Sequence, residues 1–455
     1  MLVSFSVTNF RSFFEEQTFS MVASKRLAES HPSHILPLPN SEESVLKTAI
    51  IYGANGAGKS NLFRALRYVR SIALRPNKKF QGTRREKFHT IGNDLPSSFD
   101  LQFVANNKIY RFGFKADDSK ILEEWLVEVI RGRDHIMYER ITEEDGKVRV
   151  QANKALNKNE KIKALITIGG PQNQSFLATI NATLSPSDIG KDLTEIFHWF
   201  SDTLNMIAPN EVYAPLGHEL TEDSSFLKFA GDFLKASATG VDHLETEKKE
   251  ISETELKALL PEQAWKKFSE QLEDHEDGEI GIIRIPGGNN LIVERTNENR
   301  FYKVSIQVSH KRNDECDFQL DLREESDGTR RLLDFVPALH RVQKESGVYF
   351  IDEIDRSMHP MLVWKFLEFF LNACKLSQSQ IIVTTHETNL LDLELVRRDE
   401  IWFTEKDHNL ETKIYSLMDF KVRTDLDIRK NYLNGRFGAI PFLGNFSKLE
   451  LEASC

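Results

Sequence analysis

The chain has 455 residues, a length that predicts two or three structural units rather than one. Hydrophobic residues make up 40% and charged residues 28%, a balance that predicts a folded chain with a sizeable core and excludes intrinsic disorder. Asp and Glu outnumber Lys and Arg by 69 to 59, which gives a net charge of −10. Any contact with nucleic acid must therefore come from a local basic patch.

Targeting and covalent features are few. No segment approaches the roughly 18 consecutive apolar residues that a membrane span needs, and the N-terminus lacks the basic segment that opens a secretory signal. We therefore expect a cytoplasmic protein without a membrane partner. The three cysteines, Cys316, Cys374 and Cys455, are odd in number and far apart. This pattern predicts reduced thiols rather than a disulfide framework or a cysteine-based zinc site.

The first 150 residues predict strands around a single helix. Apolar and polar residues alternate over 1–10, which predicts a strand with Val3, Phe5 and Val7 on one face and a turn at Asn9. The next predicted elements are a buried strand over 48–52, a helix over 59–74, and strands over 99–104, 108–114, 126–130 and 148–151. Turns rich in Asn, Asp and Gly separate the last four strands and predict an antiparallel sheet.

The remainder of the chain changes character twice. Residues 155–279 are rich in helix formers and charge, notably over 245–276, and predict a mainly helical insertion. Beyond it we predict strands over 280–285, 290–294 and 301–308, then a helix over 329–342, a strand over 348–351, a helix over 361–374 and a strand over 380–384. This alternation indicates parallel strands with crossover helices. We expect an N-terminal lobe over 1–154, the insertion over 155–279, a C-terminal lobe over 280–421 and a tail over 422–455.

The strongest motif is Gly53-Ala54-Asn55-Gly56-Ala57-Gly58-Lys59-Ser60, between a predicted strand and a predicted helix. This is the phosphate-binding loop pattern in its expected context. Its glycines let backbone N–H groups surround a phosphate, Lys59 neutralises the β and γ phosphates, and the Ser60 hydroxyl ligates Mg²⁺. The alternative is a chance glycine turn. The residues expected to contact nucleotide are Gly53, Asn55, Gly56, Gly58, Lys59, Ser60 and Asn61.

A second motif is the apolar strand Val348-Tyr349-Phe350-Ile351 followed by Asp352 and Glu353. Phosphate-loop folds present functional residues at the carboxyl edge of the sheet, where this strand ends. Asp352 is expected to hold Mg²⁺, and Glu353 to polarise a water for attack on the γ-phosphate. The alternative is a strand that ends in an ordinary helix cap.

Two further features narrow the class. Glu325-Ser326-Asp327-Gly328-Thr329 precedes a predicted helix, where a serine and a flexible glycine can form an anion site for the nucleotide of a neighbouring subunit. An ordinary capped helix start is the alternative. Thr384-Thr385-His386 ends the strand after the carboxylate strand, which places His386 beside the same phosphate. The alternative for His386 is a satisfied polar group.

The order of these motifs resembles the head domain of ABC-type ATPases, and Asn9-Phe10-Arg11-Ser12-Phe13 resembles the start of RecF and SMC-type heads. The run 352–360 and the tail 432–441 are similar to OLD-like, AAA-type ATPases of prokaryotic phage resistance, including RloA-, AriA- and AbiL-type components. The resemblance covers about 1–150 and 280–445.

The resemblance implies an α/β fold: a P-loop ABC-type ATPase head, with a mixed sheet and an antiparallel β lobe, carrying a helical insertion. It implies ATP and Mg²⁺ as cofactors, Glu353 and His386 as catalytic residues, and Asp352 and Ser60 as metal ligands. Ser326 and Gly328 would complete a partner's site in a homodimer or higher oligomer, and Arg11 would approach the nucleotide. The implied function is an ATP-hydrolysing switch that controls a separate nuclease or toxin effector in anti-phage defence.

Two other functions stay open. A RecF- or SMC-like DNA-repair ATPase would bind nucleic acid directly, and the basic segment 75–87 is a candidate contact. A solvated loop is the alternative for that segment. The third possibility is a scaffold that holds ATP without hydrolysing it. DNA binding in a gel-shift assay would separate the first two, and slow turnover with tight binding would indicate the third.

Overall fold

The computed structural model describes thirteen stretches of the chain. These are residues 1–77, 82–88, 94–209, 216–260, 262, 265, 280–284, 290–295, 300–311, 318–342, 345–373, 377–421 and 427–440. All three cysteines lie outside them. The chain divides into two compact units, which are described separately. Unit 1 comprises Met1–Met206, Glu345–Asp355 and Leu367–Cys455, and unit 2 comprises Ile207–Lys344 and Arg356–Phe366.

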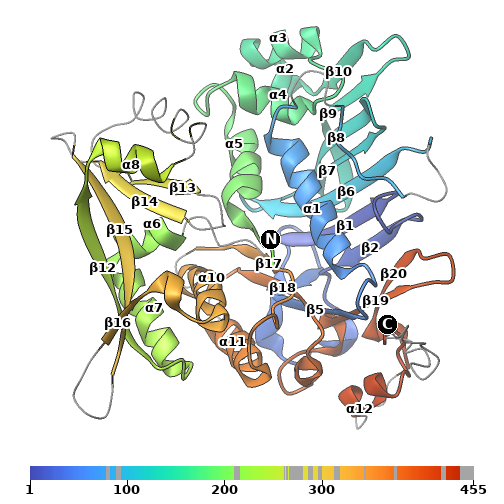
Figure 1. The fold of residues 1–455 in the computed structure, drawn as a ribbon. Helices are drawn as coiled ribbons and strands as arrows, with labels where there is room; N and C mark the ends of the chain where they lie inside the picture. Colours follow the sequence, from blue (N-terminus) through green and yellow to red (C-terminus); the bar gives the residue numbers. More distant parts are fainter. Residues whose placement is uncertain are drawn as a thin grey trace, which may run out of the picture. The chain divides into compact units, whose positions relative to one another are not determined.

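Unit 1 contains a seven-stranded sheet in the order β10-β9-β8-β7-β6-β1-β2, with every pair antiparallel (Figure 1). Its strands are β1 (Leu2–Thr8), β2 (Gln17–Ser20), β6 (Ser97–Ala105), β7 (Lys108–Ala116), β8 (Ile121–Ile130), β9 (Arg133–Thr142) and β10 (Val148–Ala152). The predicted antiparallel sheet is therefore confirmed. The strand β9 was not predicted, because its first four residues are exposed and three of them, Arg133, Asp134 and His135, are polar.

A second sheet in unit 1 is mixed and has the order β11-β17-β18-β5-β19-β20. Its strands are β11 (Leu204–Ile207), β17 (Val348–Ile351), β18 (Gln380–Thr385), β5 (Thr48–Gly53), β19 (Ile401–Lys406) and β20 (Thr412–Ser416). The central strands β17, β18, β5 and β19 run parallel, as the alternation of helix and strand predicted, and β20 is antiparallel to β19. The predicted α/β class, a mixed sheet with an antiparallel lobe, is confirmed.

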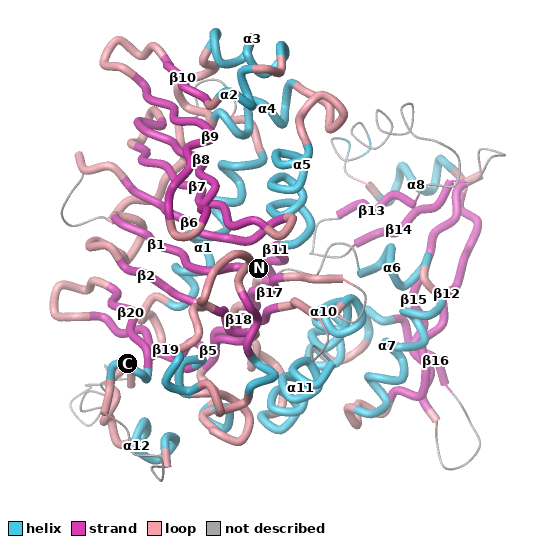
Figure 2. Tube along the Cα trace, turned by 180° about the vertical axis from the view of Figure 1, so that it is seen from behind, coloured by secondary structure: helices cyan, strands magenta, loops and turns pink. Residues whose placement is uncertain are grey.

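Helix α1 (Lys59–Leu74) packs against both sheets. Its Phe63 ring meets Phe350 of β17 edge to face, at 5.3 Å between ring centroids. On its other side, Tyr68 packs against Phe99 of β6 and Phe114 of β7. Figure 2 shows the same helix from behind. Burial of these aromatic rings, each of which removes a large apolar surface from water, fixes α1 and the loop before it.

The side chain of Gln380 connects the mixed sheet to strand β1 of the antiparallel sheet. It is fully buried at the start of β18. Its Oε1 accepts from the backbone N–H of Leu2 at 2.5 Å, and its Nε2 donates to the carbonyls of Leu2 and Leu46 at 3.1 and 2.8 Å. A buried amide stabilises a fold only when its donors and acceptors are satisfied, as they are here.

Short elements complete unit 1. The helices are α2 (Lys154–Asn157), α3 (Glu160–Ile168), α4 (Phe176–Thr183), α5 (Lys191–His198) and α12 (Ile428–Leu433), with the π-helical turn η3 (Trp199–Thr203). A two-stranded sheet pairs β3 (Ile35–Pro37) with β4 (Ser44–Leu46). The single turns are η1 (Lys25–Leu27), η2 (Pro32–His34), η6 (Thr388–Leu390), η7 (Arg398–Glu400) and η8 (Leu417–Asp419). Helix α11 (Pro360–Ala373) begins in unit 2 and ends in unit 1.

Unit 2 is built on a five-stranded antiparallel sheet in the order β12-β15-β14-β13, with β16 also paired to β15. Its strands are β12 (Val241–Ile251), β13 (Ile280–Arg284), β14 (Asn290–Arg295), β15 (Phe301–His310) and β16 (Phe318–Asp321). Its helices are α6 (Leu216–Glu222), α7 (Ser224–Ala236), α8 (Glu253–Leu259) and α10 (Asp327–Arg341), with the turn η4 (Leu322–Glu324). The core of the unit packs apolar side chains of α7 and α10 against β12 and β15.

The helix expected at the start of 245–276 is wrong, because this part of the chain belongs to the long strand β12. Ten residue pairs connect β12 to β15, from Val241 opposite His310 to Ile251 opposite Phe301. Cross-strand pairing over that length outweighs the favourable helix propensity of its Glu and Lys residues. Within the described residues, no helix combines the length and the apolar character that a membrane span requires.

Candidate nucleotide-binding site

The carboxyl ends of three neighbouring parallel strands bring five predicted motif residues together in unit 1. The register sets Thr385 opposite Tyr52 and Ile351 opposite Val383, so β5, β17 and β18 end at one edge of the sheet. Lys59 and Ser60 follow β5, Asp352 and Glu353 follow β17, and His386 follows β18. Ligands of open α/β sheets bind at this kind of edge.

The phosphate-binding loop joins β5 to α1, as predicted. Asn55 and Gly56 are exposed at its tip, where an incoming phosphate has access. Gly58, the residue before α1, has φ +112°. A Cβ atom at Gly58 would collide with the side chain of Thr412. Only glycine satisfies both restrictions, so the local backbone depends on it.

Lys59 is 5% exposed and its ammonium group is fully engaged. Nζ donates to the carbonyl oxygens of Gly53 and Ala54 at 2.7 and 3.2 Å, and lies 3.0 Å from Nε2 of His386. Burial lowers the pKa of Lys59 to about 8, although the carboxylates of Asp355, Asp352 and Glu353 oppose that effect. The positive charge predicted for phosphate binding is therefore at the base of the loop.

Asp352 is buried, and two hydroxyl groups bind its carboxylate. The Ser60 hydroxyl donates to Oδ1 at 3.2 Å and the Thr384 hydroxyl donates to the same atom at 2.6 Å. Mg²⁺ is usually held by one or two protein oxygens together with phosphate oxygens and water, so the Ser60 and Asp352 pair fits that ion. Among the described residues, no group of three or more His, Cys, Asp or Glu side chains forms a metal site by itself.

Glu353 has a strained backbone. Its φ is +51°, in the left-handed region that residues other than glycine rarely adopt, and its N–H donates to the Thr384 hydroxyl at 2.8 Å. Such strain persists where the surroundings fix it, and it is common at functional sites. The same threonine thus holds both carboxylate residues, and the sequence reasoning missed it. Its place beside His386 at the end of β18 is the signal that could have identified it.

His386 is held by a third acidic residue, Asp355. The backbone N–H of His386 donates to Oδ2 of Asp355 at 3.2 Å. Burial and then the charge of Lys59 lower the pKa of the His386 ring, while the nearby carboxylates raise it less. The ring is therefore mainly neutral near pH 7, as expected for a donor and acceptor beside a phosphate.

Hydroxyl groups from distant segments support the loop from behind. Ser12 Oγ accepts from Nδ2 of Asn61 and from Oγ1 of Thr412, each at 2.7 Å. Thr412 also lies 2.9 Å from the carbonyl oxygen of Ala57. The side chain of Asn61, one of the predicted contacts, is therefore turned toward Ser12 rather than left free. Thr412 was not predicted, because nothing near it in sequence marks it.

Arg11 lies beside Ser12 in a tight turn with φ +53°. Its N–H donates to the carbonyl of Glu86 at 2.6 Å, and its guanidinium forms an ion pair with the Glu86 carboxylate. Arg11 thus directly precedes Ser12, whose hydroxyl supports the phosphate-binding loop. Contact with nucleotide would require the guanidinium to leave Glu86.

The predicted signature residues belong to unit 2. Ser326 is the N-cap of α10, and its hydroxyl accepts from the N–H of Thr329 at 3.1 Å. A Cβ at Gly328 would lie 2.8 Å from the carbonyl of Ser357, so this glycine allows a close approach of two backbones. The helix start is confirmed, and the anion site for a neighbouring subunit stays a prediction.

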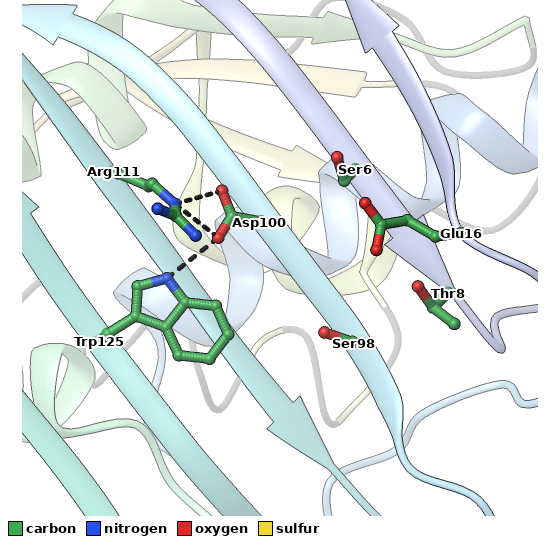
Figure 3. A pocket seen from close by; sticks show the side chains of 7 residues that line it. All are labelled: Ser6, Thr8, Glu16, Ser98, Asp100, Arg111 and Trp125. Atoms are coloured by element: carbon green, nitrogen blue, oxygen red, sulfur yellow. Dashed lines mark hydrogen bonds and ion pairs between the residues drawn. The ribbon is translucent and has the colours of Figure 1, made fainter. Parts of the chain in front are cut away.

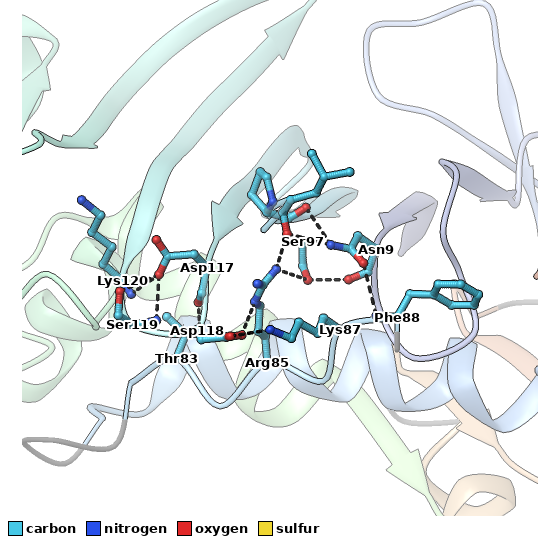
Figure 4. A network of polar contacts seen from close by, with 12 residues as sticks. Asn9, Thr83, Arg85, Lys87, Phe88, Ser97, Asp117, Asp118, Ser119 and Lys120 are labelled. Carbon is cyan, nitrogen blue, oxygen red and sulfur yellow. Dashed lines mark hydrogen bonds and ion pairs between the residues drawn. The ribbon is translucent and has the colours of Figure 1, made fainter. Parts of the chain in front are cut away.

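The basic segment 75–87 is not a uniform cationic surface. Arg85 is buried, and it donates to the Asp118 carboxylate at 2.7 Å and to the Leu95 carbonyl at 2.6 Å (Figure 4). Lys87 binds the other oxygen of Asp118 at 2.7 Å. These two cations therefore serve the fold. Lys78 and Lys79 lie outside the described residues, and Arg84 is exposed.

A separate pocket of about 260 Å³ lies on the outer face of the antiparallel sheet (Figure 3). It is lined by Ser6, Thr8, Glu16, Ser98, Asp100, Arg111 and Trp125. Arg111 and Trp125 both donate to the Asp100 carboxylate, so the arginine and aspartate of the pocket neutralise each other. No predicted nucleotide-binding residue lines it.

Comparison with solved structures gives matches to SMC head domains that cover most of the chain. The SMC head domain from Thermotoga maritima is 12% identical, covers 91% of this chain and 98% of that chain, and has a TM-score of 0.36. The SmcHead bound to the C-winged helix domain of ScpA is 14% identical, with coverages of 91% and 97% and a TM-score of 0.38. The Smc head domain with an extended coiled coil, bound to the C-terminal domain of ScpA derived from Pyrococcus furiosus, is 12% identical, with coverages of 92% and 97% and a TM-score of 0.37.

Comparison with curated proteins gives no match. A family profile described as "AAA domain, putative AbiEii toxin, Type IV TA system" matches residues 49–159 and 187–392. The match begins in β5 and ends after His386, so it spans the phosphate-binding loop, both strand-end carboxylates and the histidine. Because the matched residues are well over half of the chain, the protein belongs to this AAA-domain family.

Proposed function

We propose that the protein is an ATP-hydrolysing switch of the OLD-like, ABC-type class. One observation carries this proposal: Lys59, Ser60, Asp352, Glu353 and His386 meet at the carboxyl edge of one sheet. A phosphate-binding lysine, a Mg²⁺ ligand pair, an additional carboxylate and a histidine are the parts that ATP hydrolysis requires. Family membership supports the proposal, because the matched region includes all five residues.

Each of these five residues has a role in the proposed reaction. Backbone N–H groups of the loop and the Lys59 ammonium bind the β and γ phosphates. Ser60 and Asp352 would hold Mg²⁺, and the ion would supply positive charge beside the phosphate oxygens. Glu353 accepts a proton from the attacking water, and His386 donates to a γ-phosphate oxygen. Departure of the phosphate then frees Lys59 to return to the loop carbonyls.

The finer proposal is a head-to-head dimer with nucleotide between two copies. Its support is the start of α10, where the Ser326 cap and Gly328 leave backbone N–H groups at a helix N-terminus suited to an anion. In the dimer, Ser326 of one copy would face the nucleotide held by Lys59 of the other. Nucleotide state would then control a separate nuclease or toxin effector in phage defence, an idea that the family's toxin–antitoxin description also favours.

The decisive experiment measures phosphate release and nucleotide binding together. The wild-type protein should hydrolyse ATP, Glu353→Gln should bind ATP and lose hydrolysis, and Lys59→Ala should lose binding. Glu387→Gln is the matched control, because Glu387 caps η6 by accepting from Asn389 at 2.9 Å and carries no proposed role. Wild-type turnover by Glu353→Gln would contradict the mechanism. Tight binding without turnover in the wild type would instead support a non-hydrolysing scaffold.

A second candidate function is direct binding of DNA, which the exposed face of α1 favours. The helix contains no Asp or Glu, and Arg64 and Arg67 are exposed on it. Arg75, which follows the helix directly, and Arg84 are also exposed. Arg84 lies near the helix because Tyr68 of α1 donates to the carbonyl of Thr83 at 2.9 Å. Such a stripe can contact a phosphate backbone, although the chain as a whole is acidic.

Fluorescence anisotropy with a labelled DNA duplex tests this second candidate. Arg64→Gln with Arg67→Gln should weaken binding. The slope of the logarithm of the binding constant against the logarithm of the salt concentration should become less steep by about one for each lost phosphate contact. Arg131→Gln with Arg133→Gln removes two exposed arginines of the β8–β9 hairpin and is the control. Equal weakening by both pairs, or no binding at moderate salt, would eliminate the candidate.

A further inference from the structure

The hydrogen bond between Lys59 and His386 has only one possible direction. Nζ of Lys59 lies 3.0 Å from Nε2 of His386. An ammonium group has donors and no acceptor, so Lys59 donates and Nε2 accepts. Nε2 therefore carries no proton while this bond exists, and the neutral ring carries its single proton on Nδ1.

Nucleotide binding has to change that arrangement. In the proposed function, on which this inference rests, Lys59 moves its ammonium to the phosphates and His386 faces a phosphate oxygen. A phosphate oxygen at neutral pH is an acceptor, so the imidazole nitrogen that faces it must carry a proton. Nε2 must consequently change from an acceptor to a donor.

Asp355 is placed to favour the charged form of the ring. Its Oδ2 accepts from the backbone N–H of His386 at 3.2 Å, and its Oδ1 is buried without a partner among the described residues. The charged groups that act on His386 are Lys59 from α1 and, from the segment after β17, Asp355, Glu353 and Asp352. Removal of Lys59 to the phosphates leaves carboxylates as the near charges of the chain, and the magnesium–triphosphate complex, which keeps a net negative charge, adds to them.

We infer that Asp355 is a positioning residue for His386, and that its carboxylate couples nucleotide binding to the uptake of one proton at Nε2. The proton comes from solvent and forms a new N–H bond at Nε2. This N–H then donates a hydrogen bond to the phosphate oxygen. Lys59 keeps its own protons and exchanges the imidazole for the phosphate. Asp355 keeps the histidine backbone in place throughout and stabilises the imidazolium that results.

Isothermal titration calorimetry of the full chain measures this proton directly. A magnesium-saturated, non-hydrolysable ATP analogue is titrated at pH 6.5 in buffers with different heats of ionisation. At this pH Lys59, with a pKa of about 8, is already charged and contributes little uptake. The slope of observed heat against buffer ionisation heat should show proton uptake by the wild-type protein.

Three variants assign the proton. His386→Gln should lose the uptake while it keeps measurable binding. Asp355→Asn retains an oxygen that can accept from the His386 N–H but loses the charge, so uptake should fall at least about twofold. Glu387→Gln, which removes the next carboxylate in sequence, should leave it nearly unchanged, because the Glu387 carboxylate accepts from the backbone N–H of Asn389 rather than from His386. Melting temperatures verify that each variant is folded.

The outcomes separate this inference from the proposed function. No binding heat with the wild-type protein would contradict nucleotide binding itself. Binding without any dependence on buffer would overturn the inference alone, since a shift of the ring proton from Nδ1 to Nε2 takes up nothing. Equal proton uptake by Asp355→Asn and the wild type would also overturn it, because the charge of the Asp355 carboxylate would then not be needed.

Discussion

The hydroxyl of Thr384 donates a hydrogen bond of 2.6 Å to the buried carboxylate of Asp352. The same oxygen accepts from the N–H of Glu353 at 2.8 Å. One side chain of β18 thus orients both carboxylate residues that follow β17. Groups that orient metal ligands and catalytic residues in this way are often nearly as important as the ligands themselves.

Thr384→Val should reduce ATP turnover by about 10- to 100-fold, the range typical for loss of a support of a metal ligand. Valine preserves the shape of the side chain and removes both hydrogen bonds. Thr385→Val is the control, because the Thr385 hydroxyl accepts from Glu387 at 2.9 Å and does not contact Asp352. Steady-state phosphate release at several magnesium concentrations measures both. Equal loss in the two variants would show that threonine packing, rather than orientation of Asp352, determines the rate.

Gly58→Ala should both destabilise the protein and impair nucleotide binding. The φ of +112° disfavours alanine, and its methyl group would meet Thr412. We expect a loss of about 1–3 kcal/mol in the free energy of unfolding. Gly190→Ala is the control, since a Cβ there meets nothing within 4 Å. Urea unfolding measures stability, and a stable but non-binding variant would show that the loop conformation alone is affected.

The sequence predicted the parts of the site that follow local rules. Helix α1 begins and ends where its apolar spacing indicated, at Lys59 and Leu74, and β17 matches its predicted bounds. The loop, both carboxylates and His386 were identified because each follows a strand with a strong apolar signal. Parallel pairing then placed them at one edge.

The residues that were missed act over long sequence distances. Thr412 is 400 positions from Ser12, and their hydroxyl contact at 2.7 Å depends on the pairing of β19 with β5 and β20. Asp355 lies in the run 352–360 that carries the family resemblance, but its contact with His386 requires the folded sheet edge. Arg85 looked like part of a basic surface because its acidic partner, Asp118, is 33 residues away.

Arg85→Ala should destabilise unit 1, whereas Arg84→Ala should have little effect. The Arg85 guanidinium bonds Asp118, the Leu95 carbonyl and the Ser97 hydroxyl, and its side chain is 1% exposed. Loss of hydrogen bonds to a buried charged group costs about 1.5–3 kcal/mol. Arg84 is exposed, so its substitution should change stability by less than about 0.5 kcal/mol. Chemical denaturation midpoints compare the two, and similar midpoints would contradict the structural role of Arg85.

Ser326→Ala should prevent the nucleotide-dependent dimer. The loss of an N-cap costs about 1 kcal/mol, so α10 should remain folded, but the partner's phosphate would lose a ligand. Ser252→Ala is a matched control, because Ser252 caps α8 by the same hydrogen bond to a backbone N–H. Light scattering in the Glu353→Gln background, with and without ATP, measures the assembly. If both serine variants still form dimers with ATP, the proposed position of Ser326 at the interface is wrong.

Nucleotide affinity should decline as the pH rises above about 8. Burial lowers the pKa of Lys59 to about 8 in the free protein, and a bound polyphosphate would raise it, because an anion favours the charged ammonium. The pKa is thus higher in the complex than in the free protein, so binding takes up a proton between the two values. Affinity is therefore independent of Lys59 ionisation below pH 8 and falls above it.

Equilibrium binding of a non-hydrolysable analogue from pH 7 to 10 measures this decline. Lys59→Arg is the comparison, since arginine stays charged throughout the range and should remove the decline if the variant binds. The same decline in both proteins would assign it to another group.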